Sequence, residues 1–584
     1  MTGSKTSTPQ TNSVSPSTPF PSDETPNIVI RHRWVLLAGA LLSFLYATNI
    51  GTWDIWWHLA TGRWIMAHGA IPTTDSFSYT AKGEPWINVN WLGGLIYYGA
   101  WQLGNAAGVV ILKVVIAFGI LLFLGLAFRE LGIDTSLTIA ALVCFAVLLQ
   151  PRFSIARPFA IGALMCSIAI YLGTRFTTRK DKSILFFIPV AWIWMNIHSS
   201  AVLTIPMLVL LAAIHEISHK GARRRRVLIP LAVVVLLFAG LTRGHELMRQ
   251  VVAYDPTSLI VKYTAEWKPL TYHDRRVWVP WTLFAVAGIY GIRRFRRHPF
   301  SLGLLLMGVT LGTRFSRHLY VGVLLAAPLI TLLFSDIGRI LAAKGWRLAR
   351  LALPCIMVLT VVGLHLAVEK SGALWTEFGF GITAHRYPTD TLAVLKTLPK
   401  KRTIHDFHLG GYLTFYNMPD GVFMDGRSVQ VFREDHFKKL LDPLFHREGG
   451  LEIISDQFNI TYGIGDLHDY FHEFFMVTPD WVPVYFGDAS TLFVRKKDAQ
   501  SLSDKGMPLF PKVRYFKNID NMNIYYRALM SNPDKQSAFE TEFLEAAALN
   551  PDSDTLTRIL LYLFETAPQA ALRLSRKLQA DGSR

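Results

Sequence analysis

The sequence predicts a polytopic α-helical membrane protein with two further domains at its carboxyl end. Of its 584 residues, 51% are hydrophobic and only 17% are charged, whereas soluble domains contain about a quarter charged residues. Apolar runs recur up to about residue 367, with basic clusters between them. Beyond this point short β-like runs alternate with amphipathic stretches, and the last part of the chain has a purely helical pattern.

The apolar runs predict about eleven membrane-spanning helices. A span needs about 20 residues, and several runs are shorter, so the predicted helix ends are approximate. Together the runs predict a transmembrane domain over residues 31–367, with two long outer loops at 51–105 and 243–276. The runs lie at residues 34–50, 106–127, 135–150, 158–174, 184–196, 200–217, 227–242, 277–292, 299–313, 319–335 and 350–367.

The basic clusters predict the orientation of this domain, because loops rich in Lys and Arg are retained in the cytoplasm. A chain that starts inside and crosses at each predicted span brings every basic cluster to the cytoplasm. The net charge of +17 is therefore spread over separate loops. A nucleic-acid-binding protein would need one continuous patch, so no nucleic-acid partner is expected. The clusters lie at residues 31–33, 175–182, 219–226, 293–298 and 344–350.

Three segments lie outside the apolar region. Residues 1–30 are rich in Ser, Thr and Pro, which predicts a disordered cytoplasmic tail. Residues 368–498 predict an extracytoplasmic α/β domain. Residues 518–584 predict a short helical tail of the tetratricopeptide (TPR-like) type, with breaks at the Asn-Pro pairs of Asn532 and Asn550. Since helices of this type commonly bind other proteins, we expect a partner protein of the cell envelope there.

Polar residues of unusual type collect on the outer face of the predicted membrane domain. Charged and polar groups at membrane depth are costly and tend to mark functional sites. These residues come from at least six segments of the chain but share one membrane side. They are Asp54, His58, Asp75, Asn90, Arg152, Arg157, Asn196, His198, Glu266, Arg314, Arg317 and His318.

The stretch "TWDIWWHLATGRW", Thr52 to Trp64, combines an acid and a histidine with four tryptophans. On a helix, one stripe carries Trp53, Trp57, Ala60 and Trp64, and Asp54, His58 and Thr61 form a second stripe beside it. A helix lying flat on the bilayer would bury the first stripe in lipid and turn the second toward protein or water. The alternative is a plain interfacial anchor, which has no use for the acid.

The residues after the first span resemble a known group. "DIWWHLATGRWIMAHGAIPTTDSFSYTAKGEPWINVNWLGGLIYY" is similar to the first outer loop of bacterial multispan proteins related to the C-type (GT-C fold) glycosyltransferases that use polyprenyl-phosphate sugars. "PRFSIARP", "WIWMNIHSS", "YTAEWKP" and "HLGGYLTFYNMPDGVFMDGR" fit the same group. The resemblance covers residues 34–497 and implies a protein of the bacterial cytoplasmic (inner) membrane.

The resemblance implies an enzyme that moves a sugar from a polyprenyl-phosphate donor to a hydroxyl of a glycan or protein acceptor, with membrane lipid around it. Asp54 occupies the position of the family's acid after the first span and would act as general base. Glu266 would be the second catalytic residue. Arginines bind phosphate well through their bidentate fork, so Arg152, Arg157, Arg314 and Arg317 would hold the donor phosphate. His58, Asn196, His198 and His318 would complete the site.

One feature departs from the family. Many of these transferases carry paired acids, whereas the neighbours of Asp54 are Trp53 and Ile55. This argues against a tightly bound metal ion, so no metal ligands or other cofactors are assigned, and a divalent metal is left open. In the α/β domain, Asp425 and Arg427 are expected to have a structural role.

Two other classes of protein fit part of the pattern. A lipid or solute transporter would also carry polar residues on one face, but it should contain repeated halves with broken helices, and the sequence has none. A membrane-anchored envelope scaffold would use the helical tail, but it needs an anchor only and not about eleven spans with polar outer loops.

Overall fold

The computed structural model describes most of the chain. Its described ranges are residues 28–179, 181–218, 225–238, 278–314, 316–346, 354–363, 377–383, 386–427, 430–432, 434–446, 449–466, 480–486, 489–503 and 567–581, with single residues between them. Most of the predicted N-terminal tail and the whole predicted loop 243–276, which contains Glu266, lie outside these ranges.

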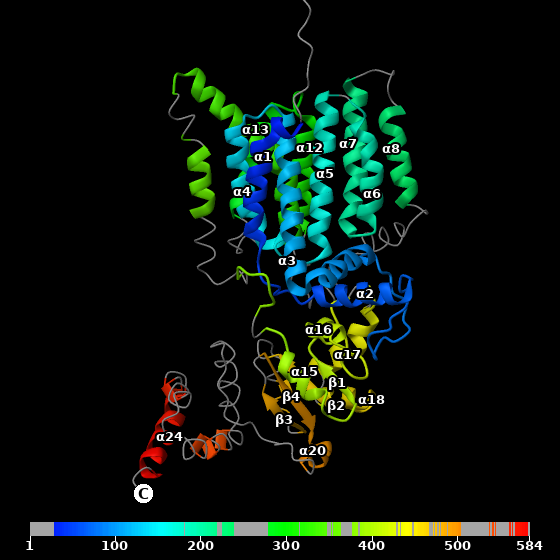
Figure 1. The fold of residues 1–584 in the computed structure, drawn as a ribbon, viewed down its shortest axis with the longest axis vertical. Coiled ribbons are helices and arrows are strands. Elements are labelled where there is room, and N and C mark those ends of the chain that lie inside the picture. Colours follow the sequence, from blue (N-terminus) through cyan, green and yellow to red (C-terminus); the bar gives the residue numbers. More distant parts are fainter. Residues whose placement is uncertain are drawn as a thin grey trace, which may run out of the picture.

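The described part is mostly helical, and its first half forms an upright bundle (Figure 1). Apolar helices occupy the places of the predicted spans. The bundle contains α1 (Ile28–Ser43), the second part of α3 (Trp91–Glu130), α4 (Thr135–Phe153), α5 (Pro158–Arg179), α6 (Phe187–Met195), α7 (Thr204–Ser218), α8 (Arg225–Leu236), α11 (Trp278–Arg293), α12 (Pro299–Arg314) and α13 (Leu319–Ala343).

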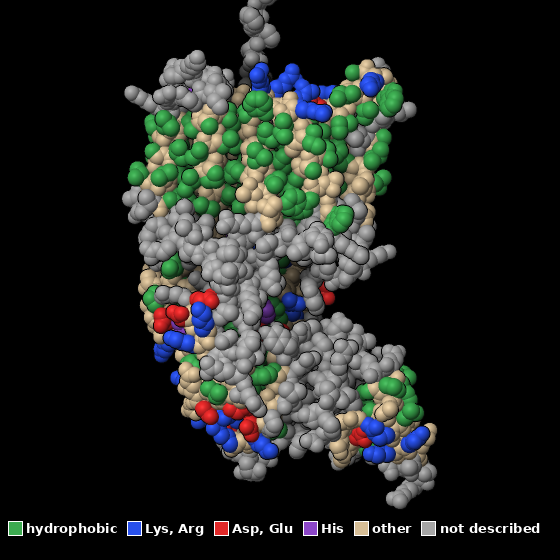
Figure 2. All heavy atoms as spheres, turned by 180° about the vertical axis from the view of Figure 1, so that it is seen from behind, with side chains coloured by type: hydrophobic (Ala, Val, Ile, Leu, Met, Phe, Trp, Pro, Cys, Tyr) green, Lys and Arg blue, Asp and Glu red, His purple; other side chains and the backbone are tan. Residues whose placement is uncertain are grey.

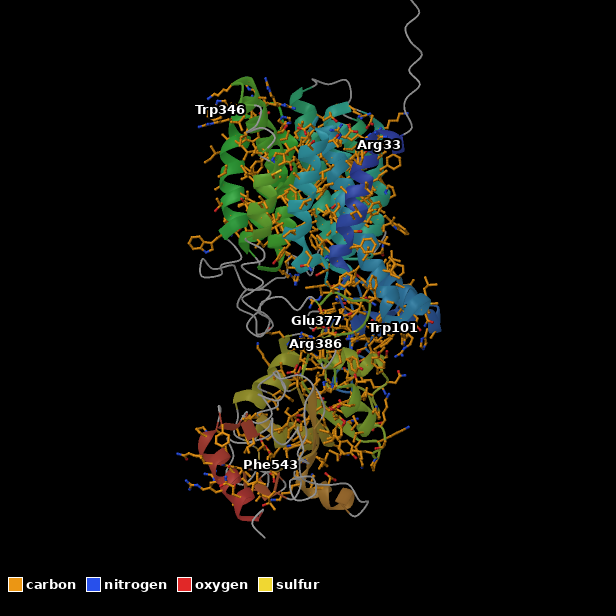
Figure 3. All side chains as sticks on the ribbon, turned by 60° about the vertical axis from the view of Figure 1, so that its left-hand side comes forward. Arg33, Trp101, Trp346, Glu377, Arg386 and Phe543 are labelled. Carbon is orange, nitrogen blue, oxygen red and sulfur yellow. The ribbon has the colours of Figure 1, made fainter. Side chains whose placement is uncertain are left out.

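The surface of the bundle is suited to lipid. Among the described residues, four helices are long and apolar enough to cross a membrane, namely α3, α4, α5 and α13, and shorter apolar helices lie beside them. Figure 2 shows hydrophobic side chains around the bundle and Lys and Arg side chains gathered at one end. We call this the basic end. Arg33 and Trp346 lie there, whereas Glu377 and Arg386 lie near the opposite end (Figure 3).

Helix α2 (Ile55–His68) lies across the opposite end of the bundle, together with the first part of α3 (Figure 1). α2 ends at Gly69, whose φ of 62° gives the left-handed cap that glycine adopts easily. Gly62 and Gly94 allow α2 and α3 to touch, because a Cβ on Gly62 would lie 2.4 Å from the Gly94 carbonyl oxygen. Non-helical residues at Gly104 and Asn105 then turn α3 into the bundle.

Beyond α2 lies a domain built on a four-stranded sheet in the order β1-β2-β4-β3. β1 (Arg402–His405) is parallel to β2 (Ile460–Asp466), whereas β4 (Ser490–Arg495) runs antiparallel to β2 and to β3 (Trp481–Phe486). Short helices accompany the sheet: α15 (Thr389–Leu395), α16 (Gly410–Phe415), α17 (Glu434–His446), α18 (Gly450–Gln457) and α20 (Lys496–Ser503). We call described residues 377–503 the sheet domain, and the adjoining end of the bundle the sheet end.

Backbone contacts join the sheet domain to the segment between α1 and α3. Bridges pair Thr48 with Phe378, and Ile50 with Ile382. A further bridge pairs Ser78 with Val422. The sheet domain is thus attached directly to the first predicted outer loop.

Only part of the predicted TPR-like tail is described. Its last helix, α24 (Pro568–Asp581), carries Arg573 and Lys577, whose side chains pair with Glu540 at 3.1 and 3.3 Å. The repeat architecture of this tail and its partner protein stay predictions.

Candidate active site at the sheet end

The site begins with an ion pair at the start of α2. Asp54 stands directly before α2, and its Oδ2 lies 3.2 Å from Nη2 of Arg157. Arg157 precedes Pro158, the first residue of α5, and its Nε donates to Oγ1 of Thr52 at 3.2 Å. The Tyr97 hydroxyl donates to the Arg157 carbonyl oxygen at 3.0 Å. Both charged side chains keep about a quarter of their surface accessible, 28% for Asp54 and 23% for Arg157, so a ligand can reach them.

Two histidines, the buried His58 and the half-buried His198, lie beside this pair. His58 follows Asp54 by one helical turn, and its ring centroid lies 3.5 Å from that of Trp57. Burial, followed by the charges of Arg157 and His198, lowers the pKa of His58 well below 6.5. The ring of His198 is fixed by Ser200, whose backbone N–H donates to Nδ1 at 3.1 Å. Both imidazoles are therefore neutral near pH 7.

Three arginines from three segments surround His198. Burial is the first cause that lowers the pKa of His198, to about 3, and the charges of Arg317, Arg152 and Arg157 follow in that order. Arg152 lies in the last turn of α4, with its guanidinium carbon 5.2 Å from the Phe159 ring centroid. Arg317 lies in the short 3-10 helix before α13. We call Arg152, Arg157 and Arg317 the arginine cluster. A group of guanidinium side chains favours binding of an anion such as phosphate.

The structure thus brings six of the predicted residues together, from the start of α2 and the ends of four other segments: Asp54, His58, Arg152, Arg157, His198 and Arg317. Their catalytic roles stay predictions. His318 directly follows Arg317 and precedes the first residue of α13. Arg314 is the last residue of α12, and its side chain, like Glu266, lies outside the described part.

Two predicted polar residues hold the fold together. Asn196 accepts from Nε1 of Trp91 at 2.9 Å, and its Nδ2 donates to the Trp192 carbonyl oxygen at 2.7 Å. Asn90 donates to the Ile197 carbonyl oxygen and accepts from Nε2 of Gln430, both at 3.0 Å. These bonds position the start of α3 against α6 and the sheet domain.

The sheet domain covers Asp54 closely. A Cβ placed on Gly426 would lie 2.8 Å from Oδ1 of Asp54 and 3.0 Å from Nε1 of Trp57. A Cβ on Gly411 would lie 3.2 Å from the Trp53 carbonyl oxygen. Only glycine permits these approaches without displacement. This cover was not predicted from the sequence. The glycines of "HLGGYL" and "FMDGR" are the feature that could have indicated such close packing.

A buried charge network fixes the loop that carries Gly426. Arg427 is fully buried, and its Nη1 donates to Asp75 at 2.6 Å. Its Nε donates to both oxygens of Asp425, at 2.8 and 3.0 Å. The guanidinium also lies 4.9 and 4.6 Å from the ring centroids of Phe77 and Trp86. Arg427 therefore joins the sheet domain to the first loop, and Asp75 has its place in this network rather than beside Asp54.

Two tryptophans of the predicted stripe, Trp53 and Trp57, contact protein, so their expected burial in the bilayer is wrong. The Trp53 ring packs edge-on against Tyr387 at 4.9 Å. The Trp56 ring lies 5.1 Å from Tyr387 and 5.0 Å from Tyr412. Trp57 is buried beneath Gly411 and Gly426. The sheet domain occupies the face of α2 that the stripe pattern had left for lipid.

Within the described part of the chain, no three His, Cys, Asp or Glu side chains come together in a way that could hold a metal ion. The described part of the candidate site contains an accessible carboxylate, neutral imidazoles and the arginine cluster. Such a set can take up a proton and bind an anion.

Comparison with known proteins gives limited similarity. No family model and no curated protein matches the sequence. Two crystal structures of ArnT from Cupriavidus metallidurans are similar to this chain. The one bound to undecaprenyl phosphate has a TM-score of 0.45 and 12% identity, over 80% of this chain and 97% of ArnT. The apo structure has a TM-score of 0.48 and 11% identity, over 80% and 98%.

Proposed function

We propose that this protein is a membrane glycosyltransferase of the GT-C type, which moves a sugar from a polyprenyl-phosphate donor to an acceptor hydroxyl at the sheet end. The observation that carries the proposal is the accessible Asp54–Arg157 pair, 3.2 Å apart, beside the arginine cluster around neutral His198. An acid that can accept a proton and cations that can hold a phosphate are the two elements that this reaction needs.

In the proposed reaction, the acceptor oxygen forms a bond to the anomeric carbon of the donor sugar. The bond between that carbon and the phosphate oxygen breaks, and the phosphate leaves with the electron pair. Asp54 takes the acceptor's proton. The arginine cluster stabilises the charge that develops on the leaving phosphate. When the phosphate engages Arg157, the Asp54 carboxylate loses part of its ion pair and becomes available as the base.

The other residues position these groups. The Thr52 hydroxyl and the Arg157 carbonyl oxygen are both hydrogen-bonded, so the guanidinium has a defined place before the donor arrives. Ser200 orients His198. The Gly426 loop limits how far the Asp54 carboxylate can turn. Glu266 and Arg314 keep the roles that the sequence predicts for them in this proposal: Glu266 as a second catalytic residue and Arg314 as a ligand of the donor phosphate.

The direct test compares Asp54→Asn with wild type in nanodiscs, using undecaprenyl-phosphate sugars as donors. We expect transfer to fall by about 10²–10⁴-fold, the usual cost of losing a general base. Asp420→Asn is the matched control, because Asp420 is an exposed acid of the sheet domain and its loss should leave transfer unchanged. Full transfer by Asp54→Asn would remove the base from the proposal. Lipid movement across the membrane without transfer would favour the transporter alternative.

The proposal also includes an orientation, with the basic end in the cytoplasm and the sheet domain outside. It is supported by the Lys and Arg side chains at the end away from the sheet domain (Figure 2). Reporter fusions at Ala384 and Gly221 should report opposite sides of the membrane. The same side for both would overturn the orientation.

A further inference from the structure

A cavity of about 430 Å³ lies in the sheet domain beside α2. This volume is within the range of small-molecule sites, about 300–1,000 Å³. We call it the tyrosine pocket, after the rings in its wall. Its polar and aromatic lining consists of Thr383, Tyr387, Thr389, Lys396, Tyr412 and Tyr416.

The aromatic wall is rigid. Tyr387 and Tyr412 stack with parallel rings 5.0 Å apart, and Tyr416 lies 4.5 Å from Tyr412. Trp56 packs against all three rings from the side of α2. Tyr387 and Tyr412 are almost fully buried, whereas Tyr416 is only half-buried. Tyr416 is therefore the ring whose surface remains for a ligand.

Polar groups surround this ring. The Thr389 and Tyr412 hydroxyls share a hydrogen bond of 2.8 Å. Nζ of Lys396 donates to the Tyr416 carbonyl oxygen at 2.6 Å and keeps two further protons for other acceptors. Thr383 adds a third hydroxyl-bearing side chain. A polyhydroxylated ligand could pair with the donor and acceptor positions of these groups that remain beyond these bonds, whereas an apolar ligand could not.

The pocket is connected to the candidate active site by one residue. The Tyr387 hydroxyl donates to the Thr52 carbonyl oxygen at 2.9 Å, and the Thr52 hydroxyl accepts from Arg157 at 3.2 Å. Asp54 and Arg157 do not line the pocket. The pocket therefore adjoins the site and is separate from it.

We propose that the tyrosine pocket binds a pyranose ring of a glycan acceptor, with the sugar ring against Tyr416 and its hydroxyls toward Thr383, Thr389 and Lys396. The C–H groups on one face of a pyranose carry a small positive charge and are attracted by the negative face of an aromatic ring. Identifying the ligand as the acceptor rests on the proposed function; sugar binding itself does not.

The test is saturation-transfer NMR of the full chain in nanodiscs, with glucose, galactose and N-acetylglucosamine as separate probes and no donor present. We expect a signal from at least one probe. Ala393→Trp fills the pocket from an exposed position of α15 and should abolish this signal. Lys400→Trp places the same bulk on an exposed residue outside the lining and should preserve it. Tyr416→Phe keeps the ring and should retain binding, whereas Tyr416→Ala should weaken it about tenfold.

Sugar binding in the tyrosine pocket would be contradicted if none of the three sugars gave a signal, or if wild type and Ala393→Trp gave equal signals. Asp54→Asn separates this proposal from the proposed function, because it should lose transfer but retain sugar binding. If Asp54→Asn still transfers sugar and Ala393→Trp still loses binding, the proposed base fails and the pocket stands.

Discussion

The two ends of the bundle both carry arginines, but in different surroundings. At the basic end, two arginines each pair with a nearby acid: Arg179 with Glu130 at 2.6 Å, and Arg175 with Asp181 at 2.6 Å. At the sheet end, Arg152, Arg157 and Arg317 come from separate segments and act together on one half-buried histidine, His198. The number of arginines therefore does not distinguish the two ends. The convergence of arginines from separate segments at one position does.

Arg427 gives the largest expected effect on stability. Arg427→Met would keep much of the side chain's volume but leave the carboxylates of Asp75 and Asp425 buried without their cation. Breaking a buried ion network in this way costs about 3–5 kcal/mol. We expect the sheet domain to melt separately from α2, detectable as faster hydrogen exchange at Val422 and in β1. Hydrogen exchange unchanged from wild type would contradict the claim that Arg427 holds the sheet domain to the first loop.

The pH dependence of stability tests the surroundings of His198 at the sheet end. Its folded pKa of about 3 lies below the ordinary value near 6.5, so the unfolded chain binds a proton that the native protein excludes. Stability is therefore complete above pH 6.5 and falls as the pH decreases toward 3. Between pH 8 and pH 5 this loss amounts to roughly 2 kcal/mol.

His198→Gln removes the titrating group, so the fall in Tm between pH 8 and pH 5 should become smaller than in wild type. An equal fall in both proteins would show that burial and the charges of Arg317, Arg152 and Arg157 do not hold the histidine neutral.

Gly426 tests whether the sheet domain acts on Asp54. Gly426→Ala would place a Cβ 2.8 Å from Oδ1 of Asp54, and the carboxylate must turn to make room. We expect kcat to fall about tenfold, the effect of a small misplacement of a reacting group, while the KM for the donor changes little. Gly99→Ala is the matched control, because Gly99 lies in the first part of α3, where a Cβ would meet no atom within 4 Å, so kcat should not change. An unchanged kcat in Gly426→Ala would limit the sheet domain to a covering role.

The smallest effect belongs to the basic end. Arg179→Ala removes a surface ion pair in which the arginine is 42% exposed. Pairs of this kind contribute about 0.2–1 kcal/mol, so Tm should change by a few degrees at most and sugar transfer should not change. A large loss of transfer would mean that the two ends are not distinct.

The sequence predicted the helical bundle, and six of the residues that it proposed for a site lie together, because apolar runs define where helices leave the membrane. Arg152 and Arg157 follow from the ends of two such runs, and His198 from a third. Loops that emerge on the same side of a bundle have a good chance of meeting, so their convergence was predictable.

The cover over Asp54 was not predictable by the same reasoning. Asp54 and Gly426 are far apart in the sequence, and a local pattern does not reveal which distant segment packs on a helix face. For this reason the spacing of Trp53 and Trp57 correctly predicted a stripe on one helix face. It did not reveal that the sheet domain, and not lipid, packs on that face. Asn196 was predicted as a site residue because it is polar at membrane depth. In the structure it accepts from Trp91, 105 residues away, and donates to the Trp192 carbonyl oxygen one helical turn earlier.

The most direct test of the account is the affinity for undecaprenyl phosphate, measured by native mass spectrometry on Arg157→Ala and Arg179→Ala. Arg157 belongs to the arginine cluster and directly precedes α5, and Arg179 is its matched counterpart at the other end of this helix. The account predicts that Arg157→Ala weakens binding about tenfold or more, the cost of a charge-assisted hydrogen bond, and that Arg179→Ala leaves it unchanged. Equal affinities in both variants would contradict the claim that the arginine cluster binds the donor phosphate.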